Sequence, residues 1–254
     1  MRVFVILPAA GIGTRMSVGS AVGASAPTPK QFLTLAGVPV LVHCLRAFLA
    51  VERVTAIYIA VRATEIDRVS AQVAEYGIAE RVHVVKGGDQ RQQSVANALE
   101  RLVADGGCID DDIVLVHDAA RPLIDADTIN RTIEAVAEHG AAIVGLPAVD
   151  TIKQVERTAH GALVTATIPR ERIVQAQTPQ GARCSLLQQV FAEAAADGFI
   201  GTDEASLLER AGIPVSVVPG SAKNFKITQH GDLELAEFYL KTAITVGTLE
   251  RANR

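Results

Sequence analysis

The chain has 254 residues and a formal net charge of −4; 49% of its residues are apolar, 4% are aromatic and Trp is absent. This length fits one large α/β domain or two small ones, and a core of aliphatic side chains suits a buried parallel sheet flanked by helices. The acidic balance argues against a general nucleic-acid binder, which usually presents a basic surface. No apolar run is long enough to predict a membrane span.

The three cysteines, Cys44, Cys108 and Cys184, are far apart in the sequence and form no Cys-x-x-Cys pair. We therefore expect three free thiols in a reducing cytoplasm. The first apolar run is too short for a signal peptide and leads directly into a glycine turn. The sequence thus predicts a cytoplasmic protein.

Apolar runs that fit strands alternate with runs that have helical spacing. In chain order they predict a strand at 2–7, a helix at 40–51, a strand at 55–61, a helix at 65–76, a strand at 82–86, a helix at 91–104, a strand at 113–117, a helix at 128–138, a strand at 141–147, helices at 183–196 and 202–211, a strand at 215–218 and a helix from 232 onward. This alternation indicates βαβ units, right-handed crossovers and a mostly parallel sheet with flanking helices.

The alternation stops after Asp150. Two short extended runs, at 151–156 and 163–168, flank a turn at 158–161, which predicts a β-hairpin. We interpret the chain as a single domain over 1–254 with a protruding arm at about 150–170. Because an isolated hairpin is marginally stable in water, we expect the arm to pack against a second subunit.

The first strand leads into a glycine-rich run at 8–16 that carries Arg15. Ligands bind at the carboxyl ends of strands in open α/β sheets; small residues let backbone N–H groups approach a phosphate, and Arg adds a fork of donors. Met16 takes the third glycine position of GxGxxG and no acidic residue follows at 28–36, which disfavours a dinucleotide site. The P-loop pattern is absent, so an ordinary glycine-rich connection is the remaining alternative.

Lys30 follows this run, between Pro29 and Gln31. A GxGxR loop followed by Pro-Lys resembles the signature of the nucleotidyltransferase fold, in which a nucleoside triphosphate is attacked at its α-phosphate. In-line attack places negative charge on the α-phosphoryl oxygens and the departing pyrophosphate, and fixed cations in a water-poor site stabilise that charge. We expect Arg15 and Lys30 to flank the triphosphate.

Two more strand ends carry candidate ligand groups. Asp89 and Ser94 follow a Gly-Gly pair and are suited to bond a base or a ribose, with a helix cap by Asp89 as the alternative. Asp118 is suited to bind a ribose or Mg²⁺, which takes one or two carboxylates plus phosphate oxygens; its alternative is a cap, and that of Arg121 is a structural ion pair. We expect His117 to be a packed strand-end residue, because phosphate nucleophiles are already ionised at neutral pH.

Five later motifs follow in order: His-Asp-Ala-Ala-Arg-Pro at 117–122, Asp-Thr-Ile-Lys at 150–153, Gln-Thr-Pro-Gln at 177–180, Thr-Asp-Glu-Ala-Ser at 202–206 and Lys-Asn-Phe-Lys-Ile-Thr at 223–228. Taken singly, each fits a helix cap or a solvated loop. Together, after the Arg15 and Lys30 motifs, they resemble the 2-C-methyl-D-erythritol 4-phosphate cytidylyltransferase family. The resemblance covers nearly the whole chain, from Val5 to Tyr239.

The resemblance implies a Rossmann-like α/β fold whose β-arm interlocks two subunits, and a reaction that joins CMP from CTP to methylerythritol 4-phosphate with Mg²⁺. It implies catalytic roles for Arg15, Lys30 and Lys226, with Lys226 stabilising phosphate charge. It implies CTP contacts from Ala9, Ala10, Gly11, Gly13, Gly88, Asp89, Ser94, Asp118 and Ala119. The metal would be held by Asp118 or through the substrate phosphates.

The resemblance also implies a site for the second substrate, a small polyol phosphate. Arg121, Thr178, Thr202 and Lys226 would bind it within one subunit, and Thr151 and Arg170 would reach it across the dimer. One feature departs from the family, because fourteen residues separate Arg15 from Lys30 where a short loop is usual. We expect 17–29 to be a mobile loop, either a lid that orders over CTP or a bulge without a role.

Other functions remain as alternatives. Ribitol-5-phosphate cytidylyltransferase shares the fold and the reaction, but its family tends to differ at Ala9–Gly11, at Ala119–Ala120 and at Glu204–Ser206. A sugar-1-phosphate nucleotidyltransferase with another base is disfavoured by the 117–122 and 202–206 motifs. An NAD-dependent oxidoreductase is weakened by Met16, and the set of basic residues argues against a non-catalytic nucleotide sensor.

Overall fold

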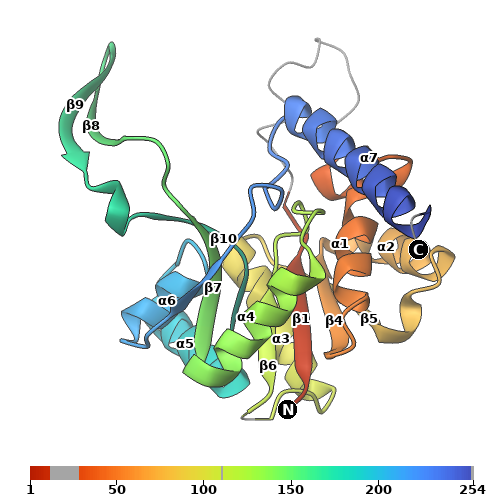
Figure 1. The fold of residues 1–254 in the computed structure, drawn as a ribbon. Coiled ribbons are helices and arrows are strands. Elements are labelled where there is room, and N and C mark those ends of the chain that lie inside the picture. The colour runs from red at the N-terminus through yellow and green to blue at the C-terminus, as the bar shows by residue number, and fades with distance from the viewer. Residues whose placement is uncertain (12–28, 110, 253–254) are drawn as a thin grey trace.

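The computed structural model describes residues 1–11, 29–109 and 111–252, with side chains described up to Thr242. Its centre is a seven-stranded sheet in the order β11-β7-β10-β6-β1-β4-β5 (Figure 1). The strands are β1 (Val3–Pro8), β4 (Val54–Val61), β5 (Val82–Lys86), β6 (Ile113–Val116), β7 (Ala141–Pro147), β10 (Val174–Arg183) and β11 (Ser216–Pro219). Neighbouring strands are parallel except where β10 pairs with β6 and β7. The predicted mostly parallel sheet is confirmed.

Helices cover both faces of the sheet because successive side chains of a strand point to opposite faces. In β1, Val5 and Leu7 belong to one core cluster, and Phe4 and Ile6 belong to the other. The first face packs against α1 (Val40–Leu49), α2 (Ile66–Glu75) and α4 (Ala126–His139), and the second against α3 (Arg91–Ala104), α5 (Cys184–Asp197) and α6 (Glu204–Arg210).

The last helix, α7 (His230–Ala252), forms a smaller cluster in which Ala236 packs with Leu35 and Ile227. Leu35 belongs to the short strand β2 (Thr34–Leu35), which pairs with β3 (Val38–Pro39). Four 3-10 turns complete the described elements: η2 (Lys30–Phe32), η3 (Ala63–Glu65), η4 (Ala79–Arg81) and η5 (Arg170–Arg172). Among the described helices, none is both long enough and apolar enough to cross a bilayer.

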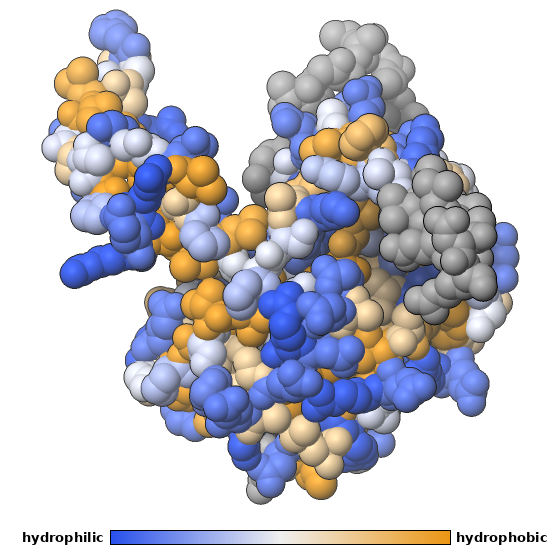
Figure 2. Space-filling model, viewed as in Figure 1, coloured by the Kyte–Doolittle hydropathy of each residue, from blue (hydrophilic) through white to orange (hydrophobic). Residues whose placement is uncertain are grey.

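The predicted hairpin is confirmed as β8 (Ile152–Thr158) and β9 (Gly161–Ile168), an antiparallel pair outside the large sheet. It stands away from the body of the molecule (Figure 1). Its apolar side chains are exposed to solvent: Val155, Leu163 and Val164 are 48%, 65% and 62% exposed. Figure 2 shows apolar residues gathered along this arm. The arm therefore has no core of its own within one chain.

Strand β10 is central in the sheet, although the sequence predicts no strand there. Its Gln177-Thr178-Pro179-Gln180 run lacks apolar alternation, and Pro within a central strand normally argues against one. The pairing with β7 shifts register between Ala176 and Gln180, so Pro179 sits in an irregular stretch rather than in a regular ladder.

The expectation of three free thiols is wrong. Cys108 and Cys184 form a disulfide, with Cα atoms 5.6 Å apart, and among the described residues Cys44 alone is free. The two partners are 76 residues apart in sequence. They meet because Cys184 begins α5 directly after β10, and β10 pairs with β6, which closely follows Cys108. The thiol argument for a reducing compartment therefore no longer applies.

Candidate active site

A cavity of about 260 Å³ opens at the carboxyl ends of β1, β5 and β6. The loops that follow these strands form its walls, and η2 and Lys226 complete it. The predicted site residues that line it are Ala9, Ala10, Gly11, Lys30, Gly88, Asp89, Ser94, Asp118, Ala119 and Lys226.

The loops after β1 and β5 are in close contact. A Cβ atom added at Gly87 would lie 2.9 Å from the Cβ of Ala10 and 3.0 Å from the hydroxyl of Ser94, so only glycine fits there. The Ser94 hydroxyl accepts the N–H of Gly88 at 3.1 Å and donates to the carbonyl of Gln90 at 3.0 Å. Ser94 therefore fixes the backbone of the loop that faces the cavity.

Asp89 lines the cavity and does not cap the following helix. The N-cap position of α3 belongs to Gln90, which makes no capping hydrogen bond through its side chain. The N–H of Asp89 donates to the side-chain oxygen of Gln93 at 3.0 Å. The capping alternative for Asp89 is therefore wrong.

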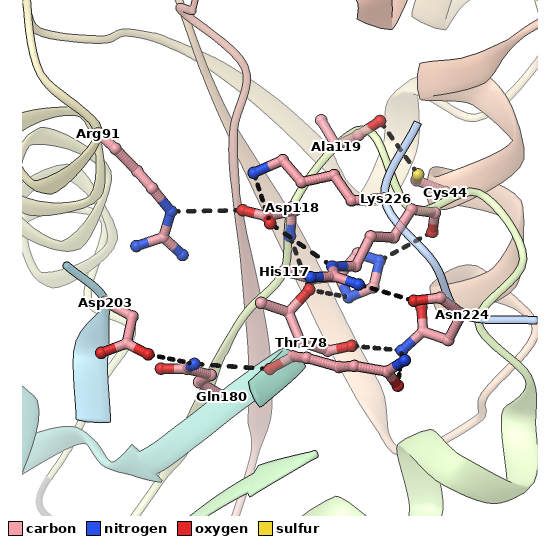
Figure 3. Close-up of polar contacts among 12 residues, drawn as sticks. Cys44, Arg91, His117, Asp118, Ala119, Thr178, Gln180, Asp203, Asn224 and Lys226 are labelled. Atoms are coloured by element: carbon pink, nitrogen blue, oxygen red, sulfur yellow. Dashed lines mark hydrogen bonds and ion pairs between the residues drawn. The ribbon is translucent and has the colours of Figure 1, made fainter. Parts of the chain in front are cut away.

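The carboxylate of Asp118 lies among three cations, and Figure 3 shows Lys226 and Arg91 beside it. The Nζ of Lys226 lies 2.9 Å from Oδ2, and the Nε of Arg91 lies 3.3 Å from Oδ1. The Nε of Arg121 lies 3.5 Å from Oδ2. Burial works to raise the pKa of the Asp118 carboxyl, but Lys226 and Arg91 outweigh burial and hold this pKa far below its usual value. The cavity thus presents an ionised carboxylate with three cationic side chains around it.

His117 and Thr178 support Asp118 from behind (Figure 3). Thr178 Oγ1 accepts the backbone N–H of Asp118 at 3.1 Å and lies 3.0 Å from Nδ1 of His117. The Nε2 of His117 lies 3.0 Å from the carbonyl of Arg121, which can only accept, so Nε2 carries the ring proton. Burial lowers the pKa of His117 to about 4. His117 is thus neutral, and it is packed at the strand end, as predicted.

The segment that carries Lys226 is fixed from both sides. Asn224 donates through Nδ2 to the carbonyl of Thr178 at 2.7 Å, and Arg121 donates to the carbonyl of Asn224 at 2.8 Å. The N–H of Ile227 donates to the carbonyl of Ala120 at 2.8 Å. These bonds join the segment to the loop after β6 and to the middle of β10, and they hold the Lys226 ammonium at Asp118.

Lys30 reaches the same cavity in spite of the long insertion before it. It is 8% exposed and lies on η2, with Nζ 2.9 Å from the carbonyl of Thr228. Its neighbour Gln31 donates to the carbonyl of Ala9 at 2.7 Å, which ties η2 to the end of β1. Lys30 and Lys226 thus face one space from two separate segments.

The other predicted residues lie elsewhere. Arg121 and Thr178 lie behind the cavity, and Thr202 is exposed, just ahead of Asp203, which caps α6. Thr151 and Arg170 are exposed at the base of the arm, where Arg170 donates to the carbonyl of Val149 at 2.6 Å. Gly13, Arg15 and residues 17–28 of the predicted mobile loop lie outside the described residues.

Arg91 lines the cavity, but the sequence did not single it out. It begins α3, directly after the loop that carries Gly88 and Asp89. Its guanidinium donates to both carboxylate oxygens of Glu204, at 2.7 and 2.9 Å. The sequence feature that could have indicated Arg91 is a cationic residue in the first turn of a helix that follows a Gly-Gly loop.

The residues present fit one kind of metal site. Within the described part of the chain, no group of three or more His, Cys, Asp or Glu side chains is placed to hold a metal. Mg²⁺ usually takes one or two carboxylates and completes its shell with phosphate oxygens and water. The single carboxylate of Asp118 therefore fits a metal held mainly by the phosphates of a ligand, but not a site made of protein groups alone.

The chain resembles characterised proteins over nearly its whole length. A family model described as 2-C-methyl-D-erythritol 4-phosphate cytidylyltransferase matches residues 3–242. A protein of that name from Acidobacterium capsulatum is 68% identical over 95% of this chain and 98% of its own length. Another from Solibacter usitatus is 51% identical over 98% of this chain and 100% of its own length.

Solved structures agree with this likeness. The crystal structure of a Francisella tularensis protein described by the same name superposes with a TM-score of 0.75 at 33% identity, covering 94% of this chain and 99% of that one. The Thermus thermophilus protein gives 0.72 at 32% identity, covering 95% and 100%.

Proposed function

Because the chain belongs to the 2-C-methyl-D-erythritol 4-phosphate cytidylyltransferase family, we propose that it transfers CMP from CTP to 2-C-methyl-D-erythritol 4-phosphate. The products are 4-diphosphocytidyl-2-C-methyl-D-erythritol and pyrophosphate, in the non-mevalonate route to isoprenoids. The observation that carries this proposal is the convergence of Lys30, Lys226 and Arg91 on one cavity beside Asp118.

The chemistry follows from that charge. A phosphate oxygen of the acceptor attacks the α-phosphorus of CTP, a new P–O bond forms, and the bond to the bridging oxygen of pyrophosphate breaks. Negative charge grows on the α-phosphoryl and leaving oxygens, and Lys30 and Lys226 are proposed to stabilise it without a proton transfer. Arg15, outside the described residues, is proposed to join them.

The remaining roles follow the walls of the cavity. The small loop residues Ala9, Ala10, Gly11 and Gly13 are proposed to accept the triphosphate and the base, together with Gly88, Asp89 and Ser94, while Asp118 and Ala119 hold the ribose side. When bound, Mg²⁺ would neutralise phosphate charge, with Asp118 as its protein ligand. Arg121, Thr178 and Thr202 are proposed to complete the acceptor side with Lys226.

The arm is proposed to complete the site in a homodimer. Thr151 and Arg170 lie at its base, outside the cavity of their own chain, and its apolar side chains are bare. A second copy would bury Val155, Leu163 and Val164 and bring Arg170 to the acceptor phosphate. The single-domain organisation and a cytoplasmic location stay predictions.

Pyrophosphate release from CTP and Mg²⁺ tests the proposal, with methylerythritol 4-phosphate and ribitol 5-phosphate as parallel acceptors. We expect release with the first acceptor alone. Release with ribitol 5-phosphate alone would keep the chemistry but assign the other acceptor. Release with neither would overturn the proposed transfer.

A further inference from the structure

The first turn of α6 is joined to the candidate site through one side chain, Glu204, which bonds to Arg91. Its side chain is 2% exposed, and both of its oxygens accept hydrogen bonds from Arg91. Such two-bond pairs between a carboxylate and a guanidinium fix geometry as well as charge. Glu204 itself does not line the cavity, whereas Arg91 does.

The start of α6 is in turn anchored to the sheet. Gln180 on β10 donates to Asp203 at 2.9 Å and accepts the N–H of Ala205 at 3.0 Å. Asp203 also forms a capping box with Ser206. Glu204 is therefore held by backbone and cap bonds on both sides, so it gives Arg91 a fixed partner.

Arg91 passes this constraint to Asp118. Its Nε donates to Oδ1 of Asp118, while its two terminal nitrogens are held by Glu204. Burial works to lower the pKa of Arg91, but Glu204 and Asp118 outweigh it and raise this pKa, so the guanidinium stays charged. With Lys226 on Oδ2, the carboxylate of Asp118 is held at both oxygens.

An ion pair with a buried carboxylate, such as Glu204 (2% exposed) with Arg91 (29% exposed), contributes little to stability by itself. Removing two charges from water costs about as much as their attraction returns, and well-packed apolar replacements are often neutral or stabilising. Breaking the pair by removing one partner is costly, because it leaves a buried charge without a partner. The Arg91–Glu204 pair is therefore best explained by the geometry that it imposes on Asp118.

We propose that Glu204 and Arg91 form a positioning pair that orients the Asp118 carboxylate for a nucleoside triphosphate and its divalent cation. This inference rests on the proposed function. It assigns the Thr-Asp-Glu-Ala-Ser motif a task at the nucleotide side of the site, with Glu204 acting through Arg91 and not on the substrate itself.

The test compares a double apolar variant, Arg91→Met with Glu204→Leu, with the single variant Glu204→Gln. Calorimetry measures CTP affinity with and without Mg²⁺, thermal unfolding measures stability, and steady-state assays give KM for each substrate. Glu209→Gln, an exposed change on the same helix, is the matched control.

We expect the double variant to unfold near the wild-type temperature but to bind CTP in the presence of Mg²⁺ about tenfold more weakly, as the loss of a charged hydrogen bond predicts. Its KM for the acceptor phosphate should change less than about twofold, as for changes away from a site. The single variant should lose both stability and CTP affinity.

A double variant that unfolds at the wild-type temperature and binds CTP with wild-type affinity would overturn the positioning role. The proposed transfer reaction would not be affected by that result. A fall in acceptor affinity equal to the fall in CTP affinity would also overturn the positioning role. A wild-type protein that binds no CTP would instead overturn the proposed function, and this inference with it.

Discussion

The wall of the cavity and the β8–β9 arm differ in how far their side chains are buried and hydrogen-bonded within one chain. Around Asp118, the carboxylate and the residues behind it are buried and bonded to β6, β10 and the Lys226 segment. Along the arm, nearly every residue of both strands is exposed. A single chain therefore holds the wall around Asp118 in place, whereas it leaves the two strands of the arm exposed.

The largest effect should come from the self-contained wall. We expect Lys226→Met to lower kcat about 10²–10³-fold, because removing one preorganised donor to developing charge typically has this effect. Lys223→Met is the control, an exposed lysine of the same segment that packs over Tyr239. Pyrophosphate release measures both. A Lys226→Met enzyme within threefold of wild type (about 0.6 kcal/mol) would contradict the placement of transition-state charge at this wall.

The ion pairs of the molecule also differ in burial, because some have a buried carboxylate and others are exposed on both sides. Asp112, 1% exposed beside β6, accepts the backbone N–H of Arg2 at 2.7 Å and its guanidinium at 2.7 and 3.0 Å. Burial works to raise the pKa of Asp112, but the bonds from Arg2 and Ile109 outweigh it and lower this pKa. Since the folded pKa lies below the unfolded one, the stabilisation is present above the unfolded value and is lost as pH falls through the folded one.

Asp112→Asn should therefore reduce the free energy of unfolding by about 1–3 kcal/mol at pH 7. The difference from wild type should narrow as pH falls below about 4, the ordinary pKa of Asp. Asp197→Asn breaks an exposed pair with Arg210 and should cost less than about 1 kcal/mol. Urea unfolding over a pH series measures both. A difference for Asp112→Asn that stays constant down to pH 3, well below the usual Asp value of about 3.9, would show that its charge contributes nothing.

Local patterns were sufficient to predict most of the fold. The predicted boundaries at 82–86, 91–104 and 141–147 are those of β5, α3 and β7, because strands buried on both faces and amphipathic helices have distinct spacings. The pattern failed at β10, where Thr178 bonds with Asp118 and Asn224 and Gln180 bonds with Asp203. Because these positions of β10 carry polar side chains that bond to the site, the strand lacks the apolar alternation by which a strand is detected.

The site was predicted in part for a similar reason. Loop residues beside strand ends, such as Ala10 and Gly88, follow from the strand pattern and the motifs. The link from Glu204 to Arg91 joins residues 113 positions apart, so no local spacing indicates it. The Cys108–Cys184 pair was missed on the same ground, because only the pairing of β10 with β6 brings the two together.

The smallest expected effect belongs to the arm. Arg170→Ala should raise KM for the acceptor phosphate about tenfold, as for one lost charge-assisted hydrogen bond, and leave KM for CTP nearly unchanged. Arg172→Ala, two residues along on the same turn, is the matched control. Equal changes in both KM values would count against a contact with the acceptor.

Mixing the two variants, with the acceptor well below its KM so that each variant alone is slow, makes the arm prediction decisive. In a heterodimer of Lys226→Met and Arg170→Ala subunits, the intact arm of the first would serve the intact cavity of the second, so one wild-type site is restored. Random exchange should then return about a quarter of wild-type activity, because half of the dimers are mixed and each has one complete site. Activity equal to the mean of the two separate variants would mean that Arg170 serves the cavity of its own chain, and the arm would no longer differ from the rest of the wall.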